Sequence, residues 1–212
     1  MWHHLDMVKS ALATILLCGT ALTPLLSQQP TKPAAVVPDR LPDSYLIYSL
    51  LMPGQVFVDM DNGGPWAISA STINEDDMDP KLAPEAELQP PDDNANGFNE
   101  AVSDYHQRRK DRMVLHRRFQ LSRPYVLLAP NAVSDFRDSR VSLNASSDLQ
   151  SQYAPYLGII YVSEVYFNVA QNAALVYILD WCGNLCSQAD WVYLEKQNGT
   201  WVRRSGKAPP QN

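Results

Sequence analysis

Residues 157–204 constrain the fold more than any other stretch, because β-branched and aromatic runs alternate there with turn signals. The second run is apolar on both faces, which is typical of a central strand. Asn198-Gly199 joins the last two runs, and this dipeptide readily adopts the positive φ angles of a tight hairpin. We therefore predict four antiparallel strands in sequence order, over residues 157–168, 173–181, 190–196 and 200–204.

Two cysteines, Cys182 and Cys186, lie between the second and third of these strands in the sequence CGNLC. A disulfide that closes this short loop would contribute about 2 kcal/mol by the loop-entropy model. A redox pair is the alternative, but the spacing with a known mechanism is CxxC before a helix. No histidine lies nearby in the sequence to complete a zinc set. We expect a structural disulfide, with free thiols or a metal site as the remaining possibilities.

The same stretch resembles an uncharacterised domain of exported proteins from soil bacteria, especially the acidobacteria. Residues 45–51, YLIYSLL, look like the N-terminal helix of that family. The chain departs from the pattern before the third strand, where Ser187, Gln188 and Ala189 replace the usual glycines. The family has no assigned activity, so the resemblance implies a fold and export but no chemistry. It rests mainly on the segments SEVYFN (163–168), ALVYI (174–178), CGNLC (182–186), VYLEK (192–196) and NGTW (198–201).

The first 27 residues have the pattern of a secretory signal peptide, with Lys9 before an apolar run. A membrane anchor is one alternative, but the run is shorter than the roughly 20 apolar residues that a span needs. A lipoprotein attached through Cys18 is another, but Leu17 is not the small residue that such signals place before the cysteine. We expect cleavage, export to the periplasm or the medium, and no stable membrane span afterwards.

Composition divides the rest of the chain. Residues 28–42 are rich in proline and polar residues and predict an extended linker, and residues 207–212 predict a disordered tail. Between them we predict one α+β domain, residues 43–206: an antiparallel meander with two or three helices packed on it, favouring a cone-shaped sheet around a helix. Its further predicted elements are helices 44–52 and 97–110, a hairpin of strands 55–60 and 65–72, and strands 114–121 and 125–128.

Charge is unevenly distributed along this domain. Residues 75–93 hold eight acidic residues and four prolines against one lysine, which predicts a mobile loop that buries little. A basic run follows, and it either pairs with the acidic loop or forms a patch for an anionic ligand or membrane surface. The net charge of −6 argues against non-specific binding of nucleic acid. The basic residues are Arg108, Arg109, Lys110, Arg112, Arg117, Arg118 and Arg123.

Three residues are weak catalytic candidates. Either His106 or His116 would have to serve as the base of a serine hydrolase, but the chain has no G-x-S-x-G elbow. Glu164 is a possible general acid if it is buried, whereas Lys196 or an arginine opposite it would make it an ion pair. We expect no cofactor, and no metal site, because Asp59 and Asp61 alone supply too few oxygen ligands for calcium.

Aromatic residues are numerous on the predicted sheet, and an open sheet face would let them bind a ligand. The candidates for such a ligand face are Trp181, Trp191, Tyr193 and Trp201. We therefore expect a non-enzymatic binding domain with an unidentified ligand or protein partner in the cell envelope. The alternative is a small secreted hydrolase that uses a glutamate or histidine with a carboxylate partner.

Overall fold

The structure is a computed structural model that describes residues 41–54, 64–78 and 83–204, all within one unit, Pro38–Asn212. The predicted signal peptide and tail lie outside these residues, as does most of the predicted linker. No helix among the described residues is long and apolar enough to cross a membrane. The helices are α1 (Leu41–Leu51), η1 (Met52–Gly54), α2 (Pro84–Glu87), α3 (Ala95–Arg108), α4 (Pro130–Val141) and α5 (Ser147–Tyr153). The strands are β1 (Trp66–Ser69), β2 (Tyr125–Leu128), β3 (Ile159–Val162), β4 (Tyr166–Phe167), β5 (Ala173–Gly183), β6 (Cys186–Gln197) and β7 (Thr200–Arg204).

All seven strands form one sheet in the order β2-β1-β3-β5-β6-β7, with β4 also paired to β5. The predicted meander is confirmed, because β3, β5, β6 and β7 pair antiparallel in sequence order. The prediction of a purely antiparallel sheet is wrong, because β1 runs parallel to both β2 and β3. Parallel neighbours need long crossover connections. Here α3 lies in the connection from β1 to β2, and α4 and α5 lie between β2 and β3.

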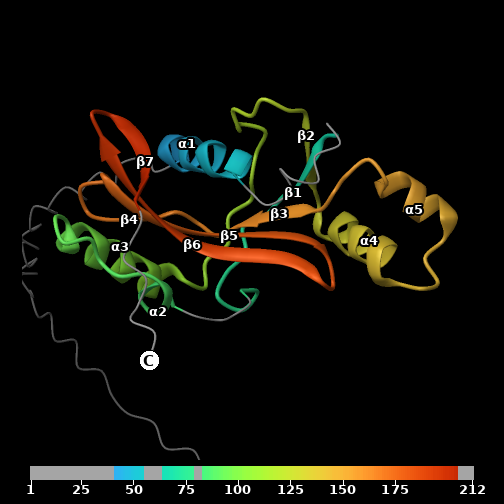
Figure 1. The fold of residues 1–212 in the computed structure, drawn as a ribbon, viewed down its shortest axis with the longest axis horizontal. Helices are drawn as coiled ribbons and strands as arrows, with labels where there is room; N and C mark the ends of the chain where they lie inside the picture. The colour runs from blue at the N-terminus through green and yellow to red at the C-terminus, as the bar shows by residue number, and fades with distance from the viewer. Residues whose placement is uncertain (1–40, 55–63, 79–82, 205–212) are drawn as a thin grey trace, which may run out of the picture. The chain divides into compact units, whose positions relative to one another are not determined.

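Helices cover both faces of this sheet, whereas the predicted cone places a helix on one face. Successive side chains of β5 point to opposite faces. Ala174, Val176 and Ile178 join the core cluster that contains α1, whereas Leu175 and Tyr177 join the cluster that contains α3 and α4. In Figure 1, α1 lies on one side of the sheet, and α3 and α4 lie on the other. The result is a three-layer α+β arrangement.

Two predicted elements differ from the structure. Residues 114–121 are not a strand, and Val114 forms only an isolated bridge with Ser71. Leu115 and Phe119 are nevertheless buried in the α1 cluster, although the segment does not pair as a strand. The first strand of the predicted hairpin, 55–60, lies outside the described residues, and its second strand contains β1, which pairs with β2 and β3.

Helices α4 and α5 were absent from the sequence-based prediction. Pro130 in the first turn of α4 and Ser146 as the cap of α5 are local helix signals. The apolar periodicity is weak, because Phe136 is the one fully buried side chain of α4 among its described residues. Its ring packs against Tyr153 of α5 at 5.2 Å between centroids. The two helices are therefore held mainly by this aromatic contact and by the sheet.

The predicted strand 157–168 is divided into β3 and β4 by Ser163. The Tyr177 N–H donates to Ser163 Oγ (2.9 Å), and Ser163 Oγ donates to the Glu164 carbonyl (2.7 Å). The Tyr48 hydroxyl of α1 donates to the Ser163 carbonyl (2.8 Å). A buried serine side chain thus replaces a backbone acceptor of the ladder. The interruption turns Glu164 toward α3.

The acidic stretch contacts the rest of the domain at a few points. Among the described residues of 75–93, Met78 and Pro84 are buried and the others are half-buried or exposed. Glu75 and Asp76 form ion pairs with Lys110 at 3.1 and 2.6 Å, as the pairing alternative for the basic run predicted. The mobility of this stretch stays a prediction.

The start of α3 is tied to the sheet through one asparagine. Asn94 Oδ1 accepts the Gly97 N–H (3.1 Å), and Asn94 Nδ2 donates to Glu195 Oε1 of β6 (2.9 Å). Glu195 is buried and also accepts a hydrogen bond from the Tyr193 hydroxyl (2.8 Å). Asn94 therefore acts as both a helix cap and a partner of a buried carboxylate.

We predict that Asn94→Ala lowers the free energy of unfolding by about 1–2 kcal/mol, because the cap is lost and Glu195 loses a donor. Asn96→Ala is the matched control, since Asn96 is exposed and bonds only to Glu100 among the described residues. Urea unfolding of both variants measures the difference. Equal stability of the two variants would contradict this account of the α3 start.

Candidate functional site

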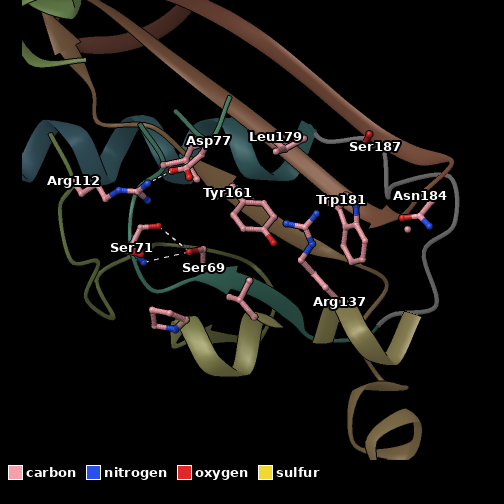
Figure 2. Close-up of a pocket in the computed structure, with 14 residues that line it drawn as sticks. Ser69, Ser71, Asp77, Arg112, Arg137, Tyr161, Leu179, Trp181, Asn184 and Ser187 are labelled. Carbon is pink, nitrogen blue, oxygen red and sulfur yellow. Dashed lines mark hydrogen bonds and ion pairs between the residues drawn. The ribbon is translucent and has the colours of Figure 1, made fainter. Parts of the chain in front are cut away.

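A cavity of about 580 Å³ lies between the sheet and α4. Its walls come from β1 and the turn that follows it, from β3, from the β5–β6 hairpin end and from α4. Polar and apolar side chains alternate around it, as Figure 2 shows. The volume lies within the range of small-molecule sites, roughly 300–1,000 Å³. The cavity is therefore the candidate functional site.

Arg137 of α4 carries an uncompensated charge at this site. Its guanidinium carbon lies 5.0 Å from the centroid of the Trp181 ring, a cation–π contact. In the part of the chain that the structure describes, Arg137 forms no ion pair with a carboxylate. Figure 2 shows its guanidinium between the rings of Trp181 and Tyr161. The aromatic contact orients the cation and leaves its charge available to a ligand.

Tyr161 of β3 contributes a buried hydroxyl to the same wall. The residue is only 8% exposed, and its hydroxyl has no hydrogen-bond acceptor within the described residues. Burial raises the pKa of Tyr161, and the positive charge of Arg137 opposes this shift. The hydroxyl is therefore protonated at neutral pH. It is a donor that lacks an acceptor.

The other end of the cavity is electrically balanced. Arg112 Nη2 lies 2.6 Å from Asp77 Oδ2 and donates to Asn74 Oδ1 (3.2 Å). Asp77 in turn accepts the Asn74 N–H (3.2 Å), which closes a tight turn after β1. Figure 2 shows this pair at the opposite end from Trp181. Asp77 thus neutralises Arg112, which helps to hold the turn after β1. Arg137 has no carboxylate beside it among the described residues.

Glu164, a weak candidate for a general acid, lies outside the cavity in an ion pair with Arg108. Arg108 of α3 donates to Glu164 Oε2 (2.7 Å), to the Val165 carbonyl (2.8 Å) and to Asp104 Oδ1 (3.2 Å). Burial raises the pKa of the Glu164 carboxyl, and the charge of Arg108 opposes the shift. Lys196, the partner named from the sequence, instead pairs with Asp43 of α1 at 2.9 Å. Glu164 therefore links the strand interruption to α3.

The two histidines lie away from the cavity and from each other. His106 Nε2 lies 2.7 Å from Glu85 Oε1, and both side chains are exposed. His116 is exposed, and its backbone N–H donates to the Tyr45 hydroxyl (2.7 Å). Among the described residues, no group of three or more histidine, cysteine or acidic side chains could hold a metal ion. Asp59 and Asp61 lie outside those residues.

The four aromatic candidates do not share an open face. Trp201 is buried in the α1 cluster, and the other three belong to the opposite cluster. Trp191 packs against Tyr105 of α3, and Tyr193 packs against Phe98 of α3. Trp181 alone of the four borders the cavity. Of the predicted ligand face, only Trp181 therefore lies where a ligand can reach it.

Arg137 was missed by the sequence-based analysis. It lies in a polar helix, outside the basic run that drew attention, and no neighbouring residue predicts its contacts. Trp181 and Tyr161 reach it from β5 and β3, which are distant in the sequence. The one usable signal was Trp181 itself, which the sequence predicts as a possible ligand contact and which borders the cavity.

The cysteine pair lies at the rim of the cavity. The Cα atoms of Cys182 and Cys186 are 5.2 Å apart, within the range of a disulfide, as predicted. Trp181 and Gly183 flank Cys182, and both line the cavity. Gly183 has a φ of 152°, a conformation that glycine adopts more easily than other residues. The bond therefore closes the hairpin end that forms this rim.

We predict that non-reducing peptide mapping of the oxidised protein will show a peptide linked through Cys182 and Cys186. Reduction should lower the free energy of unfolding by about 2 kcal/mol because the loop constraint on the unfolded chain is lost. A Cys182→Ser, Cys186→Ser double variant is the control and should not respond to reductant. Complete alkylation of both thiols in the native, oxidised protein would refute the disulfide.

Comparison with known proteins finds no relative for this chain. No protein-family model, no curated protein and no solved structure matches the chain.

Proposed function

We propose that this protein is an exported, non-enzymatic binding domain of the cell envelope, and that the cavity beside α4 takes a small-molecule ligand. The observation that carries the proposal is the cavity of about 580 Å³, with a cation stacked on Trp181 and no carboxylate beside that cation in the described residues. Pre-formed concave sites with a few convergent polar groups are typical of ligand binding. Export is supported by the N-terminal pattern and by the cysteine pair.

Binding accounts for the geometry better than the alternative of a secreted hydrolase. The three catalytic candidates lie outside the cavity, and Glu164 is engaged by Arg108. His106 and Glu85 form the histidine–carboxylate contact that a hydrolase would need, but both are exposed and lie outside the cavity lining. A nucleophile would have to come from elsewhere. The hydrolase therefore remains the second candidate, favoured only by this contact.

The proposal is tested by filling the cavity. Leu179 is half-buried and lines the cavity, so Leu179→Trp should occupy ligand space. Leu46→Trp is the matched control, because Leu46 is exposed on α1. Thermal shifts are measured with amino acids, short organic acids, sugar acids and neutral sugars. We expect at least one class to raise the Tm of the wild type and Leu46→Trp, and not of Leu179→Trp. Equal shifts in both variants would place binding elsewhere.

Export can be tested separately from ligand binding. The mature protein should begin after residue 20, because the apolar run that follows Lys9 is the expected signal. Intact mass of the protein recovered from the periplasm or the medium measures the start. A cytoplasmic protein that retains the N-terminal segment would contradict export, whatever the cavity binds.

A further inference from the structure

We infer that the ligand of this cavity is a monovalent organic acid whose carboxylate binds between Arg137 and Tyr161. The inference rests on the proposed function, since it assumes that the cavity is the ligand site. It adds the chemical class of the ligand and the two residues that recognise it.

Arg137 presents its donors in a geometry suited to a carboxylate. Its guanidinium carbon lies over the Trp181 ring, at 5.0 Å from the ring centroid. Stacking leaves the N–H groups at the edge of the plane for a ligand, and two of them match the two oxygens of a carboxylate. Arg137 also lines the cavity, so a ligand there meets this edge.

Tyr161 supplies an independent observation. A hydroxyl buried without a hydrogen-bond partner is uncommon, because its desolvation is uncompensated. The Tyr161 hydroxyl has no acceptor for its proton within the described residues, and its ring lines the cavity beside Arg137. A carboxylate held by Arg137 would provide the missing acceptor. One carboxylate would therefore bind both the Tyr161 hydroxyl and the Arg137 guanidinium.

The balance of charge selects a carboxylate over a phosphate dianion. Arg112 and Asp77 neutralise each other at 2.6 Å, so Arg137 is the one charge on the cavity lining that no described carboxylate matches. One negative charge matches it, whereas a dianion would bring a second charge that the paired Arg112 does not match. The first turn of α4 adds a weak preference for an anion, because Pro130 and Val133 line the cavity and α4 has no side-chain cap.

The other residues of the cavity indicate which group is attached to the carboxylate. Ile73, Val133 and Leu179 provide apolar wall, and Ser69 and Ser71 line the β1 side. Apolar contacts of this kind favour a short alkyl or aromatic group on the carboxylate. Hexanoate and phenylacetate are suitable probes. Hexanamide and phenylacetamide have nearly the same shape without the charge.

The experiment follows the side-chain NMR signal of Arg137 in the isotope-labelled protein, identified by its loss in Arg137→Lys. We expect a saturable shift with hexanoate or phenylacetate and none with the two amides or with inorganic phosphate. Arg137→Gln should weaken binding of the acid about 10- to 100-fold, as expected for loss of a charge-assisted hydrogen bond. Tyr161→Phe should weaken it about 3- to 10-fold. Arg117→Gln is the control, because Arg117 stacks on Tyr125 outside the cavity, and it should leave affinity unchanged.

The outcomes separate this inference from the proposed function. An amide that binds as tightly as its acid, with binding lost in Leu179→Trp, would keep the cavity as the site and overturn the carboxylate assignment. Binding of inorganic phosphate in place of the acids would overturn it as well. Acid binding that persists in Arg137→Gln, or an Arg137 signal that no acid shifts, would also overturn it. If every ligand that binds does so equally in Leu179→Trp, the proposed function itself fails.

Discussion

Ile178→Ala is expected to lower the free energy of unfolding by about 2–5 kcal/mol, the usual cost of deleting a large buried aliphatic side chain. Ile178 is 1% exposed, lies in the middle of β5 and pairs with Val162 of β3 and Asp190 of β6. Its side chain belongs to the α1 cluster, so the deletion leaves space between the sheet and α1. A domain has a stability of roughly 5–15 kcal/mol, so the loss is a large part of the total.

Urea unfolding monitored by tryptophan fluorescence measures this change. Leu185→Ala is the matched control, because Leu185 is 102% exposed at the turn between β5 and β6. The control should stay within about 0.5 kcal/mol of the wild type. A loss below about 1 kcal/mol in Ile178→Ala would mean that β5 is not the centre of the core.

Arg108→Met is expected to lower the free energy of unfolding by about 2–3 kcal/mol at neutral pH, because it leaves two acidic side chains without their cation. The side chains of Arg108 and Glu164 are 25% and 13% exposed, so solvent screens the pair only in part. The Val165 carbonyl also loses its donor. Methionine keeps most of the apolar stem of arginine, so the change tests the charge and the hydrogen bonds.

This second loss should depend on pH in a defined direction. Burial raises the pKa of Glu164, so the native state holds this proton more tightly than the unfolded state. Stability from such a group falls as pH rises through the interval between its two pKa values. Arg108 opposes the shift, and its removal enlarges it. The deficit of Arg108→Met should therefore be largest at pH ~7 and shrink toward pH ~4, where the carboxyl is protonated.

Glu164→Gln separates the charge from the rest of the pair. Alone it should cost about 0–1 kcal/mol, because Arg108 keeps Asp104 and the Val165 carbonyl. Added to Arg108→Met it should recover part of the loss and remove most of the pH dependence. A double variant with the full pH dependence would show that Glu164 is not the titrating group. Loss of a biochemical activity in Glu164→Gln, without loss of stability, would favour the hydrolase.

Local sequence patterns determined the antiparallel half of the sheet. The continuous apolar run of β5, the Asn198-Gly199 turn and the short loop between Cys182 and Cys186 each act within a few residues, and the structure has the hairpins they predict. Turn chemistry and the period of the side chains are fixed by adjacent residues, so a single sequence contains them. Ser163 is an exception, because its role depends on Tyr48 and Tyr177.

Only the tertiary structure decided the parallel half and the site. The strands β1 and β2 are four residues each, too short for a pattern to show that their neighbours are parallel. The choice depends on crossovers that carry α3, α4 and α5. The same crossovers bring Arg137 of α4 against Trp181 and Tyr161. Recognition by that group depends on distances between residues far apart in the chain, which no local periodicity encodes. The sequence therefore determined the antiparallel strands and their turns, while the packing of α4 on the sheet made the site.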